Sequence, residues 1–270
     1  MRKYAALISY AGTNYVGWQK QKGSAAAKGP ATQEVFETAL SKIVGEKVSS
    51  VGSGRTDSGV HATGQVVHFV LKRKEWDPEI LRKGLNSQLG QDIRAIAVAE
   101  VPLEFHAQRS AVRKQYSFYF QQGPCALPHL EPYTWWIRKK LDLAAMNEAL
   151  GYFRGEHDFK PFQASGARPG PTVRTVIEAE AVVEPIAFPG VDSGAFGLVR
   201  VRLIGTGFLK QMVRGLAGTL LQIGEGRREA TCIRDLLRSL DRSAVGPTAP
   251  GRALWLERVW YDPDPFGRTP

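Results

Sequence analysis

The chain has 270 residues, of which 43% are hydrophobic and 23% are charged, so intrinsic disorder and collagen-like repeats are excluded. Its length predicts about two domains at ~150 residues each, and it contains no apolar run long enough for a membrane-spanning helix. Lysine and arginine number 36 against 26 acidic residues, and the net charge of +10 favours a polyanion such as nucleic acid over a merely solvated basic surface. The basic residues are dispersed, and no amphipathic basic helix or polybasic tail indicates a membrane.

The amino-terminal segment and the cysteines predict a cytoplasmic protein. Residues 4–10 follow a basic start as a signal peptide would, but the apolar stretch is short and contains Ser9 and Tyr10, which favours a first β-strand. Cys125 and Cys232 are the only cysteines, so the sequence predicts neither a disulfide framework nor a cysteine metal cluster. This pattern is typical of a reducing compartment.

The first hundred residues predict alternating strands and helices. A strand at 4–10 precedes an amphipathic helix that Thr32 caps and Gly45 ends. A second helix follows Asp77, where an Asp-Pro pair supplies a cap and a favoured first-turn proline. The other predicted strands are 47–51, 65–71 and 92–101. The order strand, helix, strand, strand, helix, strand is the ferredoxin-like arrangement.

The second half repeats this order with longer insertions. The predicted strands are 112–120, 172–183, 198–204 and 253–261, the predicted helices are 142–153, 208–223 and 229–240, and the predicted loops are 19–31, 121–132 and 159–171. We therefore expect an α+β fold of two ferredoxin-like (βαββαβ) units, residues 1–104 and 105–270. The units are expected to share a broad, mainly antiparallel sheet with helices on one face and the other face open to a ligand such as RNA.

The densest chemical signal lies between two predicted strands, at residues 52–62, with the sequence Gly-Ser-Gly-Arg-Thr-Asp-Ser-Gly-Val-His-Ala. Its closely spaced glycines permit the backbone to approach a ligand. The segment contains G-x-G-x-x-D, but a strand follows it where a dinucleotide fingerprint requires a helix, so that interpretation is excluded. On residue types alone, a catalytic loop and a glycine-rich hairpin with Asp57 capping a turn are equally good interpretations.

Several motifs, in chain order, resemble those of the tRNA pseudouridine synthase A family. The stretches Gly-Arg-Thr-Asp at 54–57 and Gly-Val-His-Ala at 59–62 resemble its catalytic motif. The other similar stretches are 10–15, 17–19, 105–107, 110–111, 114–116, 208–209, 212–214 and 249–256. Together they extend over nearly the whole chain, and their co-occurrence is specific. Against the family pattern, residues 20–31 form a longer link, and Phe118 stands where a second tyrosine is common.

The resemblance implies an isomerase that converts uridine to pseudouridine at positions 38, 39 and/or 40 of the tRNA anticodon stem-loop, without cofactor or metal. It implies Asp57 as the nucleophile and Arg214 as the cation that keeps this carboxylate ionised. Tyr116 would stack on the uracil, Leu254 would pack on the other side of the base, and Arg55 would help to flip the uridine out of the helix. Core packing for Tyr116 and Leu254, and plain phosphate binding for Arg55, are the alternatives.

The resemblance also implies a homodimer and further tRNA contacts. The candidate contacts are Phe105, His106, Ala107, Gln108, Arg109 and Arg168. Gln108 and Arg109 replace the family's usual Arg and Phe. His61 is expected to fix its loop, because the isomerisation needs no histidine.

Two other functions compete with this assignment. The main alternative is a non-catalytic tandem ferredoxin-like RNA-binding protein, but the strands lack the aromatic RNP pattern and both Asp57 and Arg214 are present. A glycoside hydrolase would need a second carboxylate close to Asp57, and the motif contains none.

Overall fold

The computed structural model describes residues 1–20, 29–167, 169–186 and 194–269. Its contacts group the chain into two compact units, which are described separately. Unit 1 comprises Met1–Lys114 with Trp255–Pro270, and unit 2 comprises Gln115–Leu254. These bounds are not those of the predicted repeats 1–104 and 105–270, and the division into ferredoxin-like repeats stays a prediction. No helix in the described part of the chain is long and apolar enough to cross a membrane.

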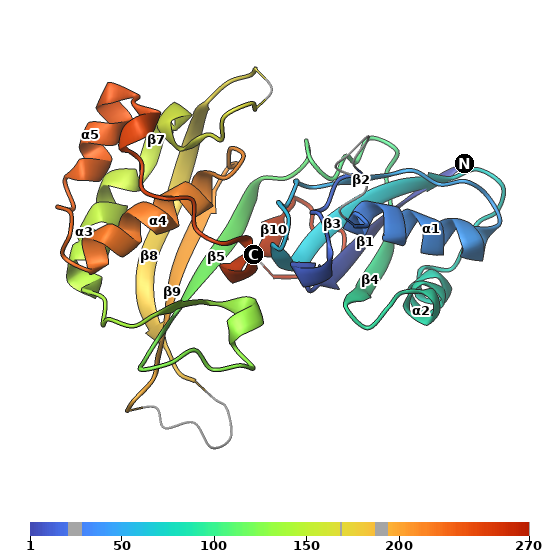
Figure 1. The fold of residues 1–270 in the computed structure, drawn as a ribbon. Helices are drawn as coiled ribbons and strands as arrows, with labels where there is room; N and C mark the ends of the chain where they lie inside the picture. Colours follow the sequence, from blue (N-terminus) through green and yellow to red (C-terminus); the bar gives the residue numbers. More distant parts are fainter. Residues whose placement is uncertain (21–28, 168, 187–193, 270) are drawn as a thin grey trace. The chain divides into compact units, whose positions relative to one another are not determined.

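Unit 1 is a sheet accompanied by two helices. Its elements are β1 (Arg2–Tyr10), α1 (Thr32–Val44), β2 (Ser50–Gly52), β3 (His61–Leu71), α2 (Pro78–Gln88), β4 (Ile93–Val101) and β10 (Leu254–Trp260), the last from Trp255 onward. Strand β1 lies between β4 and β3 and is antiparallel to both. Strand β3 also pairs antiparallel with β2 and parallel with β10. Figure 1 shows α1 and α2 beside this sheet, in contact with each other.

The core of unit 1 forms where the aromatic side chains of its strands and helices meet. Tyr4 of β1 stands opposite Phe69 of β3, and their rings stack with centroids 5.8 Å apart. Phe36 of α1 lies 6.1 Å from the same Phe69 ring, and Leu81 of α2 is completely buried. Large apolar side chains of this kind contribute most of the burial energy of a small unit. They therefore hold both helices on the sheet.

The ends of the two helices of unit 1 agree with most of the cap and stop residues predicted from the sequence. Asp77 caps α2 as predicted, because its Oδ1 accepts the N–H of Ile80 at 2.9 Å, and Gly45 ends α1 with a φ of 69°. The predicted cap at Thr32 is wrong, since Thr32 is the first residue inside the helix. Its N–H donates instead to the carbonyl oxygen of Gly17 at 3.1 Å, so a tertiary contact supplies the acceptor that a cap would provide.

Unit 2 combines a second set of strands with three helices. Its elements are β5 (Arg113–Gln122, from Gln115 onward), β6 (Trp135–Ile137), α3 (Leu143–Phe153), β7 (Gly155–Asp158), β8 (Val173–Glu184), β9 (Gly197–Gly205), α4 (Met212–Gly224) and α5 (Cys232–Ser239). The strand order is β5-β9-β8-β7, and β6 pairs parallel with β5. In Figure 1 the helices α3, α4 and α5 lie on one side of β8 and β9, and α3 contacts both other helices. The predicted α+β class is confirmed.

The core and helix ends of unit 2 agree partly with the sequence pattern. Asp142 caps α3 as predicted, and the rings of Phe153 and Phe159 pack 4.6 Å apart in the core. The helix predicted at 208–223 begins only at Met212, because Gln211 has a φ of 61°, outside the right-handed helical region. Helix α5 is shorter than the predicted 229–240. Strands β6 and β7 are not predicted, since each is too short to show an alternating pattern.

Candidate active site

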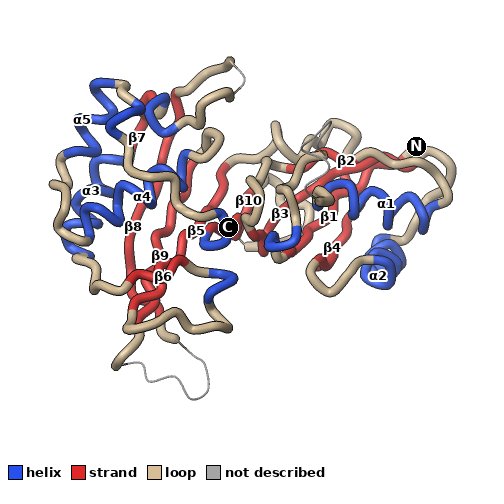
Figure 2. Tube along the Cα trace, in the orientation of Figure 1, coloured by secondary structure: helices blue, strands red, loops and turns tan. Residues whose placement is uncertain are grey.

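The glycine-rich segment forms a loop, residues 53–60, between β2 and β3 (Figure 2). Three hydrogen bonds hold its first half, two of them buried and the third, from Lys114, partly buried. The hydroxyls of Thr56 and Tyr10 are hydrogen-bonded at 2.8 Å, and the hydroxyl of Ser53 donates to Oε1 of Gln65 at 2.6 Å. Lys114 donates from Nζ to the carbonyl oxygen of Ser53 at 2.6 Å. Burial raises the pKa of Tyr10, so its hydroxyl stays neutral and keeps the hydrogen bond.

A second backbone segment supports the same loop. The N–H of Trp18 donates to the carbonyl oxygen of Thr56 at 3.0 Å, and the N–H of Gly59 donates to that of Tyr15 at 3.3 Å. Gly17 has a φ of 105°, and a Cβ there would lie 2.6 Å from the Thr56 oxygen. Only glycine permits this close approach of two backbones.

The anchoring leaves an alternating pattern of exposure along the loop. Ser53, Thr56 and Val60 are buried, whereas Arg55 is exposed and Asp57 is partly exposed. The buried hydroxyls therefore fix the backbone, and the intervening charged side chains are presented from a rigid support. Such support is what a positioned catalytic carboxylate requires.

His61 stands at the end of the loop as a structural residue, as expected. Its Nδ1 accepts the N–H of Gly12 at 3.0 Å, and its ring stacks on Trp255 with centroids 4.4 Å apart. The side chain is fully buried. Because Trp255 and His61 are register partners in β10 and β3, the closing strand helps to fix the loop at 53–60.

The remaining principal site candidates lie in unit 2. Tyr116 of β5 is 7% exposed, and its ring meets Phe208 edge-on at 5.1 Å. Leu254 is buried at the start of β10. Arg214 lies in the first turn of α4 and is half-buried; its Nε donates to the carbonyl oxygen of Ala249 at 2.7 Å. The Arg214 guanidinium therefore has a defined direction.

Residues 245–250, here called the strap, run along α4 and hold Arg214 from outside the helix. The N–H of Ala249 donates to the carbonyl oxygen of Arg214 at 3.1 Å, and the N–H of Gly246 donates to the Thr219 hydroxyl at 3.0 Å. A Cβ on Gly218 would lie 1.7 Å from the carbonyl oxygen of Pro247. Strap and helix thus touch backbone to backbone, which the sequence motifs did not reveal.

The predicted tRNA-contact segment at 105–109 forms a loop held by two histidine rings. Nδ1 of His68 accepts the N–H of Ala107 at 3.1 Å, and Nδ1 of His106 accepts the N–H groups of Gln108 and Arg109 at 3.2 and 3.3 Å. Ala107 is fully buried, whereas Gln108 and Arg109 are exposed. The hydroxyl of Tyr261 also donates to the Ala107 carbonyl oxygen at 2.6 Å. Sequence reasoning missed His68 and Tyr261, since only tertiary packing brings them to this loop.

Two other sequence expectations bear on the candidate site. The predicted contact Arg168 lies outside the described residues. Within the ranges that the structure describes, no group of three or more His, Cys, Asp or Glu residues is arranged to hold a metal ion.

The loop at 105–109 should make the stability of the protein depend on pH. The pKa of His68 is lowered from 6.5 to about 4, chiefly by burial and then by the nearby His106, Lys3 and Arg109. Between these values the unfolded chain binds a proton that the folded chain does not, so stability is full above pH 6.5 and decreases as the pH falls toward 4. Between pH 7 and pH 5 this one group should remove about 2 kcal/mol.

His68→Asn should reduce that pH dependence, because Asn Oδ1 can accept the Ala107 N–H but does not titrate. Urea unfolding at pH 7 and pH 5 measures the effect. The wild type should lose more stability than the variant between these two pH values. Equal losses would show that His68 is not the responsible group.

Comparison with known proteins identifies the family. A family model described as tRNA pseudouridine synthase matches residues 6–108 and 149–262. The tRNA pseudouridine synthase A of Ruminiclostridium cellulolyticum is 39% identical over 261 residues, which cover 97% of this chain and 100% of that protein. The tRNA pseudouridine synthase A of Streptococcus mutans is 38% identical, over 97% of this chain and 100% of that protein. The protein of the same name from Myxococcus xanthus is 36% identical, over 100% of this chain and 96% of that protein. The chain belongs to the tRNA pseudouridine synthases, a family of isomerases.

Proposed function

We propose that this protein isomerises uridine to pseudouridine at positions 38, 39 and/or 40 of the tRNA anticodon stem-loop, with Asp57 as the nucleophile. The observation that carries the proposal is the loop at 53–60. Its buried hydroxyls at Ser53 and Thr56 fix the backbone, while Asp57 between its anchored neighbours keeps partial access to solvent. That combination suits a carboxylate that must meet a nucleoside in a defined position.

The proposed reaction conserves every atom of the uridine. The Asp57 carboxylate adds to C1′ or to C6, and the N1–C1′ bond breaks. The detached uracil then turns, a C5–C1′ bond forms, C5 releases its proton and N1 takes one up. No oxidant, reductant or second substrate is consumed, and release of Asp57 regenerates the enzyme.

Arg214 is the proposed cation that keeps the Asp57 carboxylate ionised. A carboxylate in a water-poor pocket otherwise takes up a proton, because burial disfavours the charged form. The Arg214 Nε–Ala249 hydrogen bond fixes the direction of the guanidinium, which supports a positioning role more than that of a mobile surface arginine.

The other proposed contacts concern the base and its extraction. Tyr116 would stack on the uracil, with its hydroxyl placed to help move the C5 proton, and Leu254 would pack on the opposite side. Arg55, exposed beside Asp57, would help to flip the uridine out of the helix and stabilise the opened stack. We further infer that Phe105, His106, Ala107, Gln108, Arg109 and Arg168 serve tRNA binding. We also infer that the protein is a cytoplasmic homodimer built from two ferredoxin-like units on one sheet. The tRNA contacts and the homodimer rest on the family resemblance, whereas the compartment rests on the two scattered cysteines and the two units on the predicted order of strands and helices.

A direct assay tests the proposed function. Purified protein incubated with an unmodified tRNA transcript should form pseudouridine at one or more of positions 38–40, mapped by chemical probing. Transcripts with cytidine at all three positions provide the control. Binding without any pseudouridine would instead support the non-catalytic RNA-binding alternative.

The net charge of +10 predicts that tRNA affinity falls steeply with salt. Each neutralised phosphate should contribute about −0.7 to −0.9 to the slope of log K against log salt, because counterions are released on binding. Filter binding from low to physiological salt measures the slope. A flat dependence would argue against a nucleic-acid substrate.

A further inference from the structure

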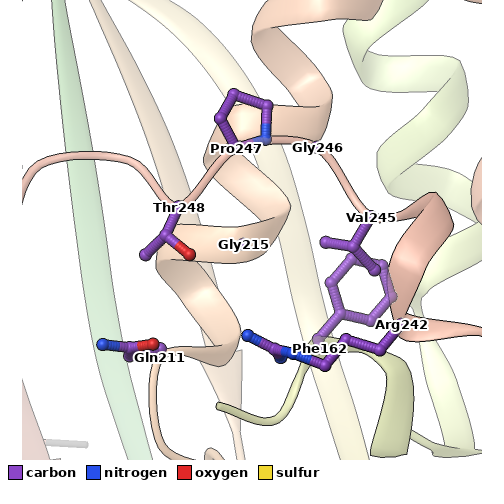
Figure 3. Close-up of a pocket in the computed structure, with 8 residues that line it drawn as sticks. All are labelled: Phe162, Gln211, Gly215, Arg242, Val245, Gly246, Pro247 and Thr248. Carbon is purple, nitrogen blue, oxygen red and sulfur yellow. The ribbon is translucent and has the colours of Figure 1, made fainter. Parts of the chain in front are cut away.

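A pocket of about 240 Å³ lies within unit 2, where α4 begins beside the strap (Figure 3). Its lining residues are Phe162, Gln211, Gly215, Arg242, Val245, Gly246, Pro247 and Thr248. Phe162, Val245 and Pro247 provide apolar walls, and three side chains are polar. No carboxylate is among the lining residues, so the charge of the pocket is positive.

The polar side chains converge on one space. Figure 3 shows the Arg242 guanidinium extending toward the space beside Gln211 and Thr248. Arg242 is half-buried and is held by its Nη1, which donates to the carbonyl oxygens of Gln163 and Pro161. These bonds use only one nitrogen of the guanidinium, and a guanidinium has five N–H donors.

The polar side chains of the pocket have hydrogen-bond donors available to a ligand. Within the described part of the chain, the structure records no hydrogen bond from the side chains of Gln211 and Thr248, nor from Nε and Nη2 of Arg242. An amide N–H, a hydroxyl and an arginine around one anion are a typical set for phosphate binding. The positive end of the 13-residue helix α4, which begins directly after Gln211, favours the same ligand.

The pocket adjoins the proposed catalytic arginine. Gln211 precedes Arg214 by one helical turn, and Thr248 precedes Ala249, whose carbonyl oxygen accepts the Arg214 Nε–H. The same two segments therefore line the pocket and orient Arg214. An anion in the pocket would lie beside the nucleotide on which Arg214 acts.

We propose that this pocket binds a backbone phosphate of tRNA next to the target uridine. Arg242 supplies the charge, and the Gln211 amide and Thr248 hydroxyl supply neutral hydrogen bonds. The pocket volume suits one phosphate group with part of its sugar and is small for a larger organic ligand. The identification of the ligand as tRNA rests on the proposed function.

Salt-dependent binding tests the proposal with full-length protein. The probe is a tRNA transcript with cytidine at positions 38–40, so that binding does not depend on turnover. Arg242→Gln, which keeps an N–H donor, should weaken binding several-fold at low salt and reduce the log–log salt slope by about one phosphate. Thr248→Val should weaken binding a few-fold with an unchanged slope, because it removes a neutral donor of the same shape.

Arg238→Ala provides the matched control, because Arg238 is exposed on α5 and does not line the pocket. Its slope should equal that of the wild type, and all variants should melt within a few degrees of it. A wild-type slope in Arg242→Gln together with unchanged affinity in Thr248→Val would overturn the proposal.

A second measurement distinguishes binding of a tRNA backbone phosphate from binding of free inorganic phosphate. If inorganic phosphate at millimolar concentration stabilises the wild type but not Arg242→Gln, while tRNA binding is equal in both, the pocket takes a free anion and the proposal is wrong. Pseudouridine formation by the wild type is measured in parallel on a uridine-containing transcript. If the wild type forms no pseudouridine, the proposed function is refuted. The salt slopes of tRNA binding then still decide whether the pocket binds a phosphate.

Discussion

Asp57→Asn should abolish detectable pseudouridine formation while tRNA affinity stays within a few-fold of wild type. The amide has nearly the shape of the carboxylate but cannot form the covalent bond to the nucleoside. The buried anchors at Ser53 and Thr56 do not involve the Asp57 side chain, so the loop should keep its fold. A loss of at least about a thousandfold corresponds to about 4 kcal/mol of transition-state support, at 1.36 kcal/mol for each factor of ten.

Ser58→Ala is the matched control for Asp57→Asn. Ser58 is the exposed next residue of the same loop, and its hydroxyl donates to the carbonyl oxygen of Tyr15 at 3.2 Å. Its single-turnover rate should stay within a few-fold of wild type. Turnover by Asp57→Asn at even a tenth of the normal rate would remove Asp57 from the nucleophile role.

Gly218→Ala should strongly destabilise unit 2. The added Cβ would lie 1.7 Å from the carbonyl oxygen of Pro247 and 2.8 Å from its carbonyl carbon. Both are backbone atoms, so the strap must move away from α4, at a cost of about 1–3 kcal/mol or more for overpacking. Because the strap also bonds Arg214, pseudouridine formation should fall together with stability. Urea unfolding and the tRNA assay measure the two effects.

Gly151→Ala controls for the change of helix propensity. Gly151 lies inside α3, it is exposed, and a Cβ there would meet nothing within 4 Å. This substitution should be neutral or should stabilise by up to about 1 kcal/mol, the propensity difference between alanine and glycine. If Gly218→Ala were as stable as Gly151→Ala, the close contact between strap and helix would be absent.

Several elements could be predicted from short stretches of sequence because their causes are local. Asp77 and Asp142 accept N–H groups three residues onward, and Gly45 supplies the left-handed residue that ends α1. The family is also evident from the sequence, because its motifs at 54–62 and 212–214 occur in the expected order. Such features need only residue type and spacing.

Other features depend on contacts between distant parts of the chain. Thr32 resembles a cap in sequence, but the carbonyl oxygen of Gly17 satisfies its N–H. Arg214 is oriented by the carbonyl oxygen of Ala249, 35 residues away. No pattern of residue types near Thr32 or Arg214 predicts these contacts, because the backbone group that each residue meets comes from another segment of the chain. Residue order therefore specified the motifs and most helix ends, whereas tertiary packing decided the supports of Asp57 and Arg214, because a buried backbone group takes whichever partner the fold brings near.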